Sequence, residues 1–275
     1  MRVLINYDYR YYPMTTASYI ERALRADPRI SVFRVGEDRV PCADLIINIE
    51  PCPKVISYPG RPSVYWEIDN HIHRGKDIDK YQKVDWVFIT QRYFLHLYPK
   101  VITKWLPLAA DPDIHKLYTD EPLNYDVGFI GNDTYQRRRG LLDLIGKNYK
   151  LLREKNIFDD NYSRHLSRCK ILFNCSMDND VNMRFFEAMS IGRLLLADRL
   201  PCQDAIVKDG IHYVAYDEWG DLNERISYFL EHENERENIA AAGAAYIRAK
   251  HTYKHRLENI LKVLNFYYLK ILLIY

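Results

Sequence analysis

The sequence lacks any apolar run long enough to cross a membrane. No stretch of its 275 residues approaches the roughly 20 consecutive apolar residues that a spanning helix needs. The apolar part of residues 1–7 is too short for a signal peptide, and we interpret it as a first strand. We therefore expect a cytoplasmic protein.

Motifs for several common enzyme classes are also missing. The five cysteines include no Cys-x-x-Cys pair, and their odd number favours reduced, mostly buried thiols. The histidines are scattered without the spacing of zinc ligands. A P-loop, a Gly-x-Gly-x-x-Gly motif after the first strand and a Gly-x-Ser-x-Gly motif are all absent. These absences argue against P-loop kinases, dinucleotide-dependent oxidoreductases and serine hydrolases.

Neither charge is in large excess. The 39 Lys and Arg residues nearly balance the 37 Asp and Glu residues, which leaves a net charge of +2. This balance argues against a nucleic-acid or membrane partner. Tyrosine, by contrast, is abundant, with 23 copies, four of them at Tyr7, Tyr9, Tyr11 and Tyr12. Its ring suits stacking on sugars and bases, although packing at the surface is the commoner use.

Short apolar runs alternate with helical patterns along the chain, which predicts parallel sheets covered by helices on both faces. A polar, proline-containing stretch at residues 118–122 separates two such series. We therefore predict an N-terminal domain over 1–118, a C-terminal domain over 119–255, and a C-terminal helix over 256–275. Strands are expected at 3–5, 31–35, 44–49, 63–68, 86–89, 171–176, 194–197 and 211–216. A last strand and a turn of the first series are expected within 104–112, and the second series begins within 125–132.

The last segment, residues 261–275, is strongly apolar but too short to span a bilayer. We expect it to pack back on the first domain. Contact with a partner or a membrane surface is the alternative, and such a segment allows a homodimer.

Residues 182–192 form the most informative motif. An apolar run at 171–176 and an acidic turn at 177–180 precede it, and a second apolar run follows, so we predict strand, loop, short helix and strand. Gly192 suits the end of the helix. A helix that begins at the carboxyl end of a parallel strand offers free N–H groups to a diphosphate. Arg184 would face the phosphate charge, and Glu187 would accept hydrogen bonds from ribose hydroxyls.

The turn before this helix, Asp178-Asn179-Asp180, has the Asp-x-Asp pattern of a divalent-metal site. Similar acidic triplets occur at 77–79 and 111–113, so the pattern is weak. We predict no metal site.

Polar residues also follow a predicted strand of the first domain. Asp69, His71 and His73 lie just after the strand at 63–68. Loops at the carboxyl ends of parallel strands are where an acid or base would act on an acceptor hydroxyl. We take Asp69 as the best candidate base, with His71 and His73 behind it; an ordinary capped loop with exposed histidines explains the same residues equally well.

Four segments together resemble glycosyltransferases of the GT-B fold, in particular the branch related to the spore-maturation protein CgeB. They are residues 125–132 with Arg137 behind them, residues 182–192, His251-Thr252-Tyr253-x-x-Arg256, and residues 105–111. The resemblance covers residues 105–260 well and the first hundred residues only in strand order. Residues 182–192 and 251–256 in combination are fairly specific.

The resemblance implies two Rossmann-like domains that face each other across a cleft, with a C-terminal helix crossing back to the first. It implies a nucleoside-diphosphate sugar donor, UDP most simply, on the C-terminal domain, and a glycan, protein or small-molecule acceptor on the other. No cofactor or metal is required. The donor-binding residues it implies are Gly131, Asn132, Arg137, Asn182, Arg184 and Glu187.

The chain departs from the family at Asn179. Many retaining GT-B enzymes have a second glutamate at this position, eight residues before the one at Glu187. The sequence therefore leaves open whether the configuration of the sugar is retained or inverted. It also leaves open a non-catalytic protein that binds a nucleotide sugar or glycan, and a transferase that modifies DNA bases.

Overall fold

The computed structural model describes residues 1–11, 15–36, 42–100 and 102–272, with side chains for all of these except Tyr11 and residues 265–272. The chain divides into two compact units. Unit 1 contains Met1–Leu108 and Tyr253–Tyr275, and unit 2 contains Ala109–Thr252. The sequence-based divisions were placed after residues 118 and 255.

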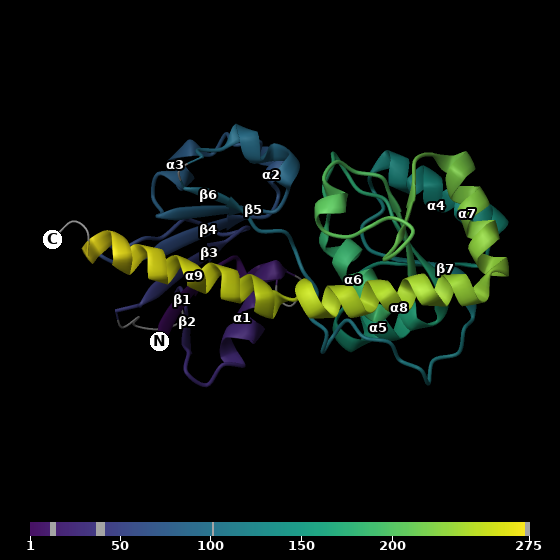
Figure 1. Cartoon of the computed structure of the whole chain (residues 1–275), viewed down its shortest axis with the longest axis horizontal. Helices are drawn as coiled ribbons and strands as arrows, with labels where there is room; N and C mark the ends of the chain where they lie inside the picture. Colours follow the sequence, from purple (N-terminus) through teal and green to yellow (C-terminus); the bar gives the residue numbers. More distant parts are fainter. Residues whose placement is uncertain (12–14, 37–41, 101, 273–275) are drawn as a thin grey trace. The chain divides into compact units, whose positions relative to one another are not determined.

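Unit 1 is built on a six-stranded parallel sheet in the order β2-β1-β3-β4-β5-β6 (Figure 1). Its two neighbouring strands β3 and β4 are buried along their whole length, as expected for strands covered on both faces. The chain leaves β1 toward β2 on one side and then returns to β3 on the other. The strands are β1 (Arg2–Asn6), β2 (Ser31–Arg34), β3 (Leu45–Ile49), β4 (Ser63–Glu67), β5 (Trp86–Ile89) and β6 (Thr103–Trp105).

The helices of unit 1 join the two ends of the chain. Helix α1 (Thr16–Arg25) packs against α9 (Tyr253–Leu272), where the rings of Tyr19 and Tyr253 stack at 5.0 Å. The buried Arg256 donates from Nε to the Pro107 carbonyl oxygen at 2.6 Å. The remaining helices are α2 (Asn70–His73), α3 (Ile78–Tyr81) and the 3-10 helices η1 (Tyr9–Tyr11) and η2 (Arg92–Leu97).

Unit 2 contains a five-stranded parallel sheet in the order β11-β10-β9-β7-β8. Here the chain leaves β7 toward β8 at one edge and then crosses to β9 on the opposite side. The strands are β7 (Tyr125–Ile130), β8 (Leu151–Glu154), β9 (Cys169–Asn174), β10 (Leu194–Asp198) and β11 (Val214–Tyr216). Strand β8 was not among the predicted strands, because it is short and carries Arg153 and Glu154 among its four residues.

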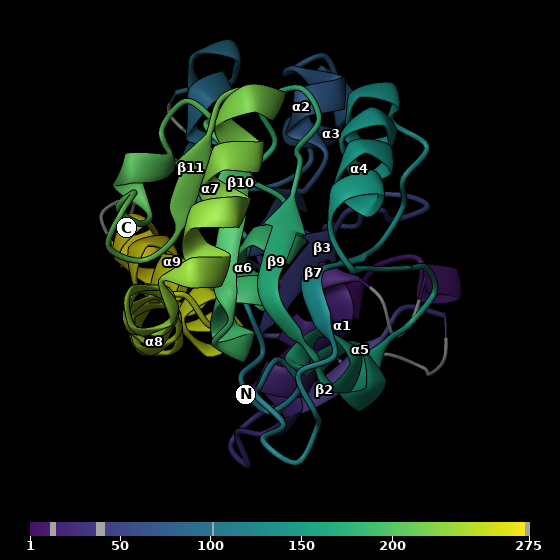
Figure 2. The same cartoon turned by 90° about the vertical axis from the view of Figure 1, so that its right-hand side faces the viewer.

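Helices cover the sheet of unit 2 (Figure 2). Helices α4 (Gln136–Asn148) and α7 (Trp219–Glu231) share one hydrophobic core with alternate residues of the strands. Helices α5 (Asp159–Ser167), α6 (Met183–Ile191) and α8 (Glu233–Lys250) also contact the strands, and η3 (Gln203–Ala205) follows β10.

The prediction of two Rossmann-like parallel α/β domains is confirmed, and α9 joins the first of them. Within the described residues, every helix is too short or too polar to cross a membrane. The packing predicted for the apolar tail concerns side chains that, beyond Leu264, lie outside the described part of the chain.

Candidate functional site

The candidate donor site lies at the carboxyl ends of β7 and β9. These strands are neighbours in the sheet, but the connections that leave them run to opposite sides. Ligands of open α/β sheets bind at such a switch point, in the crevice between the two diverging loops. The loop after β7 carries Gly131 and Asn132, and the loop after β9 leads to Asn182 at the start of α6.

Helix α6 begins and ends where the sequence predicts. The Asn182 side chain accepts a hydrogen bond from the Phe185 backbone N–H at 3.3 Å and so caps the first turn. Phe185, Phe186 and Met189 are fully buried. Gly192 ends the helix with a φ of 92°, a left-handed conformation that glycine adopts without a steric penalty. The helix N-terminus is thereby fixed at the edge of the sheet.

Arg184 bridges the carboxyl ends of the two strands at the switch point. Its Nε donates to the Ile130 carbonyl oxygen at 2.9 Å, and its Nη1 donates to Asn174 Oδ1 at 3.1 Å. The guanidinium lies over the Phe129 ring, 4.5 Å from the centroid. Burial lowers the pKa of Arg184, which is still far too basic to lose its proton at neutral pH. The site therefore contains a positioned positive charge.

Gly131 leaves room for the Arg184 guanidinium next to the end of β7. It has a φ of 150°, and a Cβ at this position would collide with Nη2 of Arg184. A residue with a side chain would strain the backbone and displace the guanidinium, so this contact in its present form depends on glycine.

Glu187 lies one turn into α6, with only 8% of its surface exposed. Burial raises the pKa of its carboxyl to about 7, although the charge of Arg184 and the Tyr162 hydroxyl oppose this shift. A carboxyl with this pKa titrates near neutral pH. A partly accessible acceptor beside a fixed cation can bind the hydroxyls of a ribose whose diphosphate meets the cation.

Two residues beside Glu187 were missed by sequence reasoning. His115 Nε2 lies 3.5 Å from Glu187 Oε1, while His115 Nδ1 accepts a hydrogen bond from the Asp111 backbone N–H. The buried Tyr162 hydroxyl approaches the same carboxyl but completes no hydrogen bond with the described residues. Both come from segments without a predicted role, and α5 itself was not predicted. The spacing of Tyr162 and Leu166, one helical turn apart, is the one sequence signal within α5 that indicates an inward-facing tyrosine.

The three consecutive arginines of α4 have different surroundings. Arg137 Nη1 donates to Asp198 Oδ2 at 2.9 Å, within an ion pair at the carboxyl end of β10. The buried Arg138 holds the two loops together by donating to the Asn132 and Cys175 carbonyl oxygens. Arg139 is exposed. Arg137 was predicted from the sequence, whereas its counter-ion Asp198 was not.

Asp198 is another buried carboxyl of this region. Burial raises its pKa, while the Ser176 backbone N–H and Arg137 oppose the rise. The Ser176 N–H donates to both of its oxygens, at 2.9 and 3.1 Å. Asp198 therefore fixes the start of the loop that leads to α6.

The loops contribute little else that could hold a cation. Asn132 is exposed, and its Oδ1 accepts a hydrogen bond from the Thr134 backbone N–H. Asp178 and Asn179 have left-handed backbones at φ 48° and 62°. Across residues 1–11, 15–36, 42–100 and 102–272, no group of three or more His, Cys, Asp or Glu side chains is arranged to hold a metal ion.

The candidate base residues lie in unit 1, at the end of β4. The Asp69 carboxylate is partly exposed and forms no hydrogen bond or ion pair with the described residues. His73 lies between two carboxylates, with Nε2 at 2.7 Å from Glu50 and Nδ1 at 3.6 Å from Asp77. His71 is buried. Of the three, Asp69 has the side chain most available to a ligand.

Glu50 organises this loop, although the sequence analysis did not select it. Its Oε2 accepts hydrogen bonds from the backbone N–H groups of Ile68 and Asp69, both at 2.8 Å. Its Oε1 contacts His73. Burial raises the pKa of Glu50, and the Asp69 N–H and His73 counter that rise. Since Glu50 follows β3 directly, a strand-end carboxylate was the only sequence signal for it.

Several solved structures share this fold. The HepE protein of Anabaena, solved with UDP and glucose, has a TM-score of 0.69 and 11% sequence identity, with 96% of this chain and 99% of HepE covered. Sucrose-phosphate synthase from Thermosynechococcus elongatus has a TM-score of 0.67 and 10% identity over 98% of this chain and 99% of that one. A glycosyltransferase from Rickettsia africae has a TM-score of 0.65 and 8% identity, with coverage of 97% and 98%.

The sequence comparisons give one family. No curated protein sequence matches the chain. The model of the family described as "Glycosyl transferase-like" matches residues 123–262, which include the switch point of unit 2, all of α6 and the start of α9. With the GT-B fold of both units, the match shows that the chain belongs to the glycosyl transferase-like family.

Proposed function

We propose that the protein transfers a sugar from a UDP-sugar to an acceptor hydroxyl. The observation that carries the proposal is that Arg184 and Glu187 both lie near the start of α6, where the charge of Arg184 acts on the Glu187 carboxyl. A fixed guanidinium beside a helix N-terminus matches a diphosphate, and a buried carboxyl one turn further matches a ribose. HepE, which has the same fold, was solved with UDP and with UDP-glucose. Membership of the CgeB-like branch is part of this proposal.

Catalysis in this proposal rests on positioning and on charge. The acceptor oxygen forms a bond to the anomeric carbon, the bond from that carbon to the diphosphate breaks, and UDP leaves with the electron pair. Arg184 and the N–H groups of the first turn of α6 stabilise the negative charge that develops on the leaving phosphate. We propose that these groups make a metal ion unnecessary. Arg137 forms an ion pair with Asp198. When the diphosphate takes the place of Asp198 in this pair, Arg137 adds a further positive charge to the site.

Two other functions make different predictions. A non-catalytic member of the family would bind the nucleotide sugar and release no nucleotide. A DNA-modifying transferase would bind DNA with an affinity that falls steeply as salt rises. The net charge of +2 gives the protein little electrostatic attraction to DNA, which argues against a DNA partner.

Thermal unfolding with nucleotides tests the proposal. UDP, GDP, dTDP, ADP and CMP are compared, each with magnesium and with EDTA, and nucleotide release from the matching sugar donor is then measured. UDP at about 100 times its dissociation constant should stabilise the protein by roughly 2.7 kcal/mol, equally in EDTA. Stabilisation by none of the nucleotides would contradict the donor site, and stabilisation that requires magnesium would contradict metal independence.

Asp69 is the proposed base, because its carboxylate is accessible and its backbone is fixed by Glu50. Asp69→Asn should reduce turnover by about 100-fold or more, the usual contribution of a general base. UDP affinity should stay unchanged, since the donor groups lie in unit 2. Steady-state rates and UDP titrations measure the two effects. The matched control is Asp79→Asn, which alters an exposed carboxylate on α3; normal turnover in Asp69→Asn would remove this role.

A further inference from the structure

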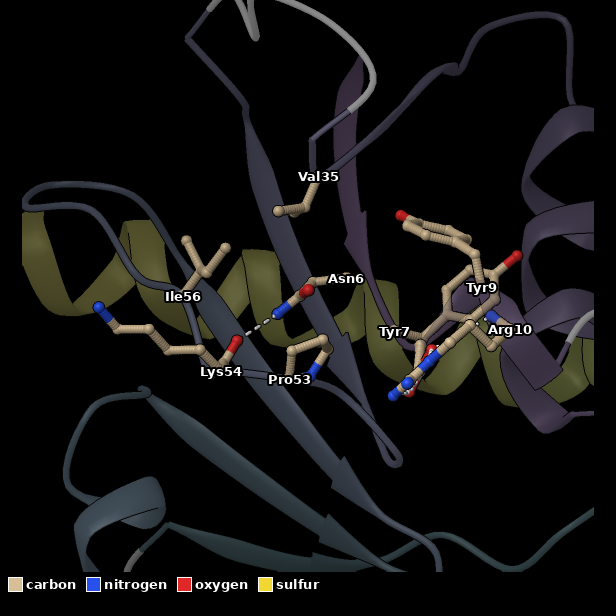
Figure 3. A pocket seen from close by; sticks show the side chains of 9 residues that line it. Asn6, Tyr7, Tyr9, Arg10, Val35, Pro53, Lys54 and Ile56 are labelled. Atoms are coloured by element: carbon tan, nitrogen blue, oxygen red, sulfur yellow. Dashed lines mark hydrogen bonds and ion pairs between the residues drawn. The ribbon is translucent and has the colours of Figure 1, made fainter.

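Buried polar side chains have two kinds of surroundings in this fold, and Asn48 of unit 1 represents the first. Its Oδ1 accepts hydrogen bonds from Asn6 Nδ2 and the Ile56 backbone N–H, and its Nδ2 donates to the carbonyl oxygens of Ile56 and Val64. Asn6 also donates to the Lys54 carbonyl oxygen at 2.7 Å (Figure 3). Every hydrogen-bonding position of Asn48 is thereby used within the protein, which is typical of a side chain that fixes a loop.

The Tyr162 hydroxyl represents the second kind. It is sealed from solvent inside unit 2 but has no hydrogen-bond partner among the described residues. An unpaired buried hydroxyl lowers stability, and a phenylalanine would fill the same space without that penalty. The ring lies edge-on to His115, with 5.9 Å between the ring centroids, and the hydroxyl approaches the Glu187 carboxyl. The hydroxyl is therefore placed for an interaction with Glu187.

His115 is placed beside the same carboxyl as a neutral donor. Its Nδ1 accepts a hydrogen bond from the Asp111 backbone N–H at 3.0 Å, and a backbone N–H can only donate. Nδ1 is therefore unprotonated, so the ring is neutral and carries its proton on Nε2. That nitrogen lies 3.5 Å from Glu187 Oε1. Because the side chain is only 1% exposed, it cannot reach a substrate, which excludes His115 as a catalytic acid or base.

Helix α6 fixes the position of His115. Glu187 and Ser190 are three residues apart and so lie on one face of the helix. The Ser190 hydroxyl donates to the His115 carbonyl oxygen at 2.7 Å, while Glu187 lies beside the imidazole. The His115 backbone N–H donates to the Asp111 carbonyl oxygen, also at 2.7 Å, within a turn at residues 111–115. The imidazole is thus held in one place against Glu187.

The charge of the Glu187 carboxyl depends on its neighbours. Among the described residues, the charged and titratable groups that face it are Arg184 from α6, Tyr162 from α5 and His115 from the turn. Burial favours the protonated carboxyl, whereas the Arg184 charge and the Tyr162 hydroxyl favour the carboxylate. Burial also raises the pKa of Tyr162, so its hydroxyl keeps its proton. Tyr162 and His115 therefore add donors without adding a second cation, which would compete with ribose hydroxyls for the carboxylate.

We propose that His115 and Tyr162 are positioning residues for the nucleotide. When UDP binds, their N–H and O–H groups close onto Glu187, keep it as a carboxylate and leave its remaining lone pairs for the two ribose hydroxyls. Hydrogen bonds at binding sites are often long before the ligand arrives and tighten in the complex. Both ribose hydroxyls can donate to an ionised carboxyl, whereas a protonated carboxyl has fewer lone pairs to offer. The inference rests on the proposed function, since it concerns the ribose of the bound nucleotide.

Tyr162→Phe removes the hydroxyl and keeps the ring. The fold and its stability should be retained, because the lost group has no partner. One hydrogen bond contributes about fivefold to an equilibrium, so UDP affinity at about pH 6.5 should fall about fivefold and the pH midpoint of binding should rise by about 0.7 unit. At about pH 8.5, where Glu187 is ionised in both proteins, most of the loss should disappear. Tyr125→Phe, at the amino end of β7, is the matched control and should bind normally.

Two substitutions of His115 separate the roles of its two nitrogens. Asparagine places an acceptor near Nδ1 and nothing near Nε2, so His115→Asn should keep the bond from the Asp111 N–H and lose the donor to Glu187. Its pH midpoint should rise, as in Tyr162→Phe. Glutamine reaches further and places an N–H near Nε2, so His115→Gln should bind UDP close to normally. Calorimetric titrations compare each variant with the unmodified protein at each pH, because the titration of the UDP phosphate is common to all of them.

Double variants with Glu187→Gln test whether the effects act through Glu187. In that background Tyr162→Phe should weaken UDP binding no further. Additive losses, or losses of equal size at every pH, would overturn the inference, while UDP binding by the unmodified protein would leave the proposed function standing. If no nucleotide binds the unmodified protein, the proposed function fails. Carbon NMR of the Glu187 carboxyl then decides the inference: an upward shift of its titration in Tyr162→Phe supports the action on Glu187, and an unshifted titration overturns it.

Discussion

Glu187→Gln should weaken UDP binding about 100-fold. In the proposed complex the carboxylate accepts hydrogen bonds from the two ribose hydroxyls, and bonds to a charged acceptor contribute roughly 1.5–3 kcal/mol each. A glutamine keeps the shape but offers one neutral oxygen, so a loss of about 2.7 kcal/mol, or 100-fold in affinity, is expected. Titration calorimetry measures the difference, and Glu224→Ala, at an exposed position on α7, is the matched control.

The same variant should remove a dependence on pH. Glu187 has a pKa of about 7, so roughly a tenth of the molecules carry the carboxylate at pH 6 and most do at pH 8. Affinity of the unmodified protein should therefore rise over this interval. The terminal phosphate of UDP also titrates, near pH 6, and for that reason the informative quantity is the difference between the two proteins. Parallel pH profiles would contradict the ribose role.

The pH dependence of protein stability tests the raised pKa of the Glu187 carboxyl independently. Its pKa in the folded state, about 7, is raised above the ordinary value of 4.5, so the folded state holds the proton more tightly. Below pH 4.5 the group has no effect, and between pH 4.5 and 7 it should cost stability on the order of 3 kcal/mol. Glu187→Gln should lack this decline. Glu67→Gln makes the equivalent comparison in unit 1, where burial also raises a glutamate pKa to about 7.

Features encoded by neighbouring residues could be predicted from the sequence. The boundaries of α6 follow from the capping side chain of Asn182 and from the backbone freedom of Gly192, both local effects. The parallel sheets follow from continuous apolar runs, such as residues 45–49, which are buried throughout. Two domains of the same class follow from the repetition of that pattern.

The environment of each side chain could not be predicted in this way. Arg184 and Gly131 are 53 positions apart, and only the pairing of β7 with β9 brings them into contact. His115 and Tyr162 reach Glu187 from separate segments, and nothing local to either one signals that meeting. The raised pKa of Glu187 is a consequence of burial, which belongs to the assembled unit and not to α6.

For the candidate base, too, the sequence predicts the local feature, and the fold determines the environment of each side chain. The polar loop after β4 is predictable from the sequence, which favours Asp69 over His71 and His73 only because a carboxylate suits the task. The fold distinguishes them, since Glu50 from the end of β3 contacts His73 and fixes the backbone of Asp69. The order of the strands places the Glu50 carboxylate against the backbone of this loop and leaves the Asp69 carboxylate accessible.

Gly131→Ala should destabilise unit 2 by about 3 kcal/mol and weaken UDP binding. The residue has a φ of 150°, a conformation that costs a non-glycine residue roughly 1–3 kcal/mol. The new methyl group would also displace Arg184 from the Ile130 carbonyl oxygen and from Asn174. Chemical denaturation measures the first effect, and UDP titration of the folded variant measures the second.

Two other glycines of the same unit separate the causes. Gly210 has a φ of 73° with open space around it, so Gly210→Ala carries the backbone penalty alone and should leave UDP binding intact. Gly140 lies in α4 with no atom near a new Cβ, and Gly140→Ala should be neutral or stabilise by about 0.4–1 kcal/mol. If Gly131→Ala lost no more stability than Gly210→Ala and bound UDP normally, Arg184 would not need its place against Gly131. In that case the positive charge of the donor site would have to come from another residue, and Arg137 would be the next residue to mutate.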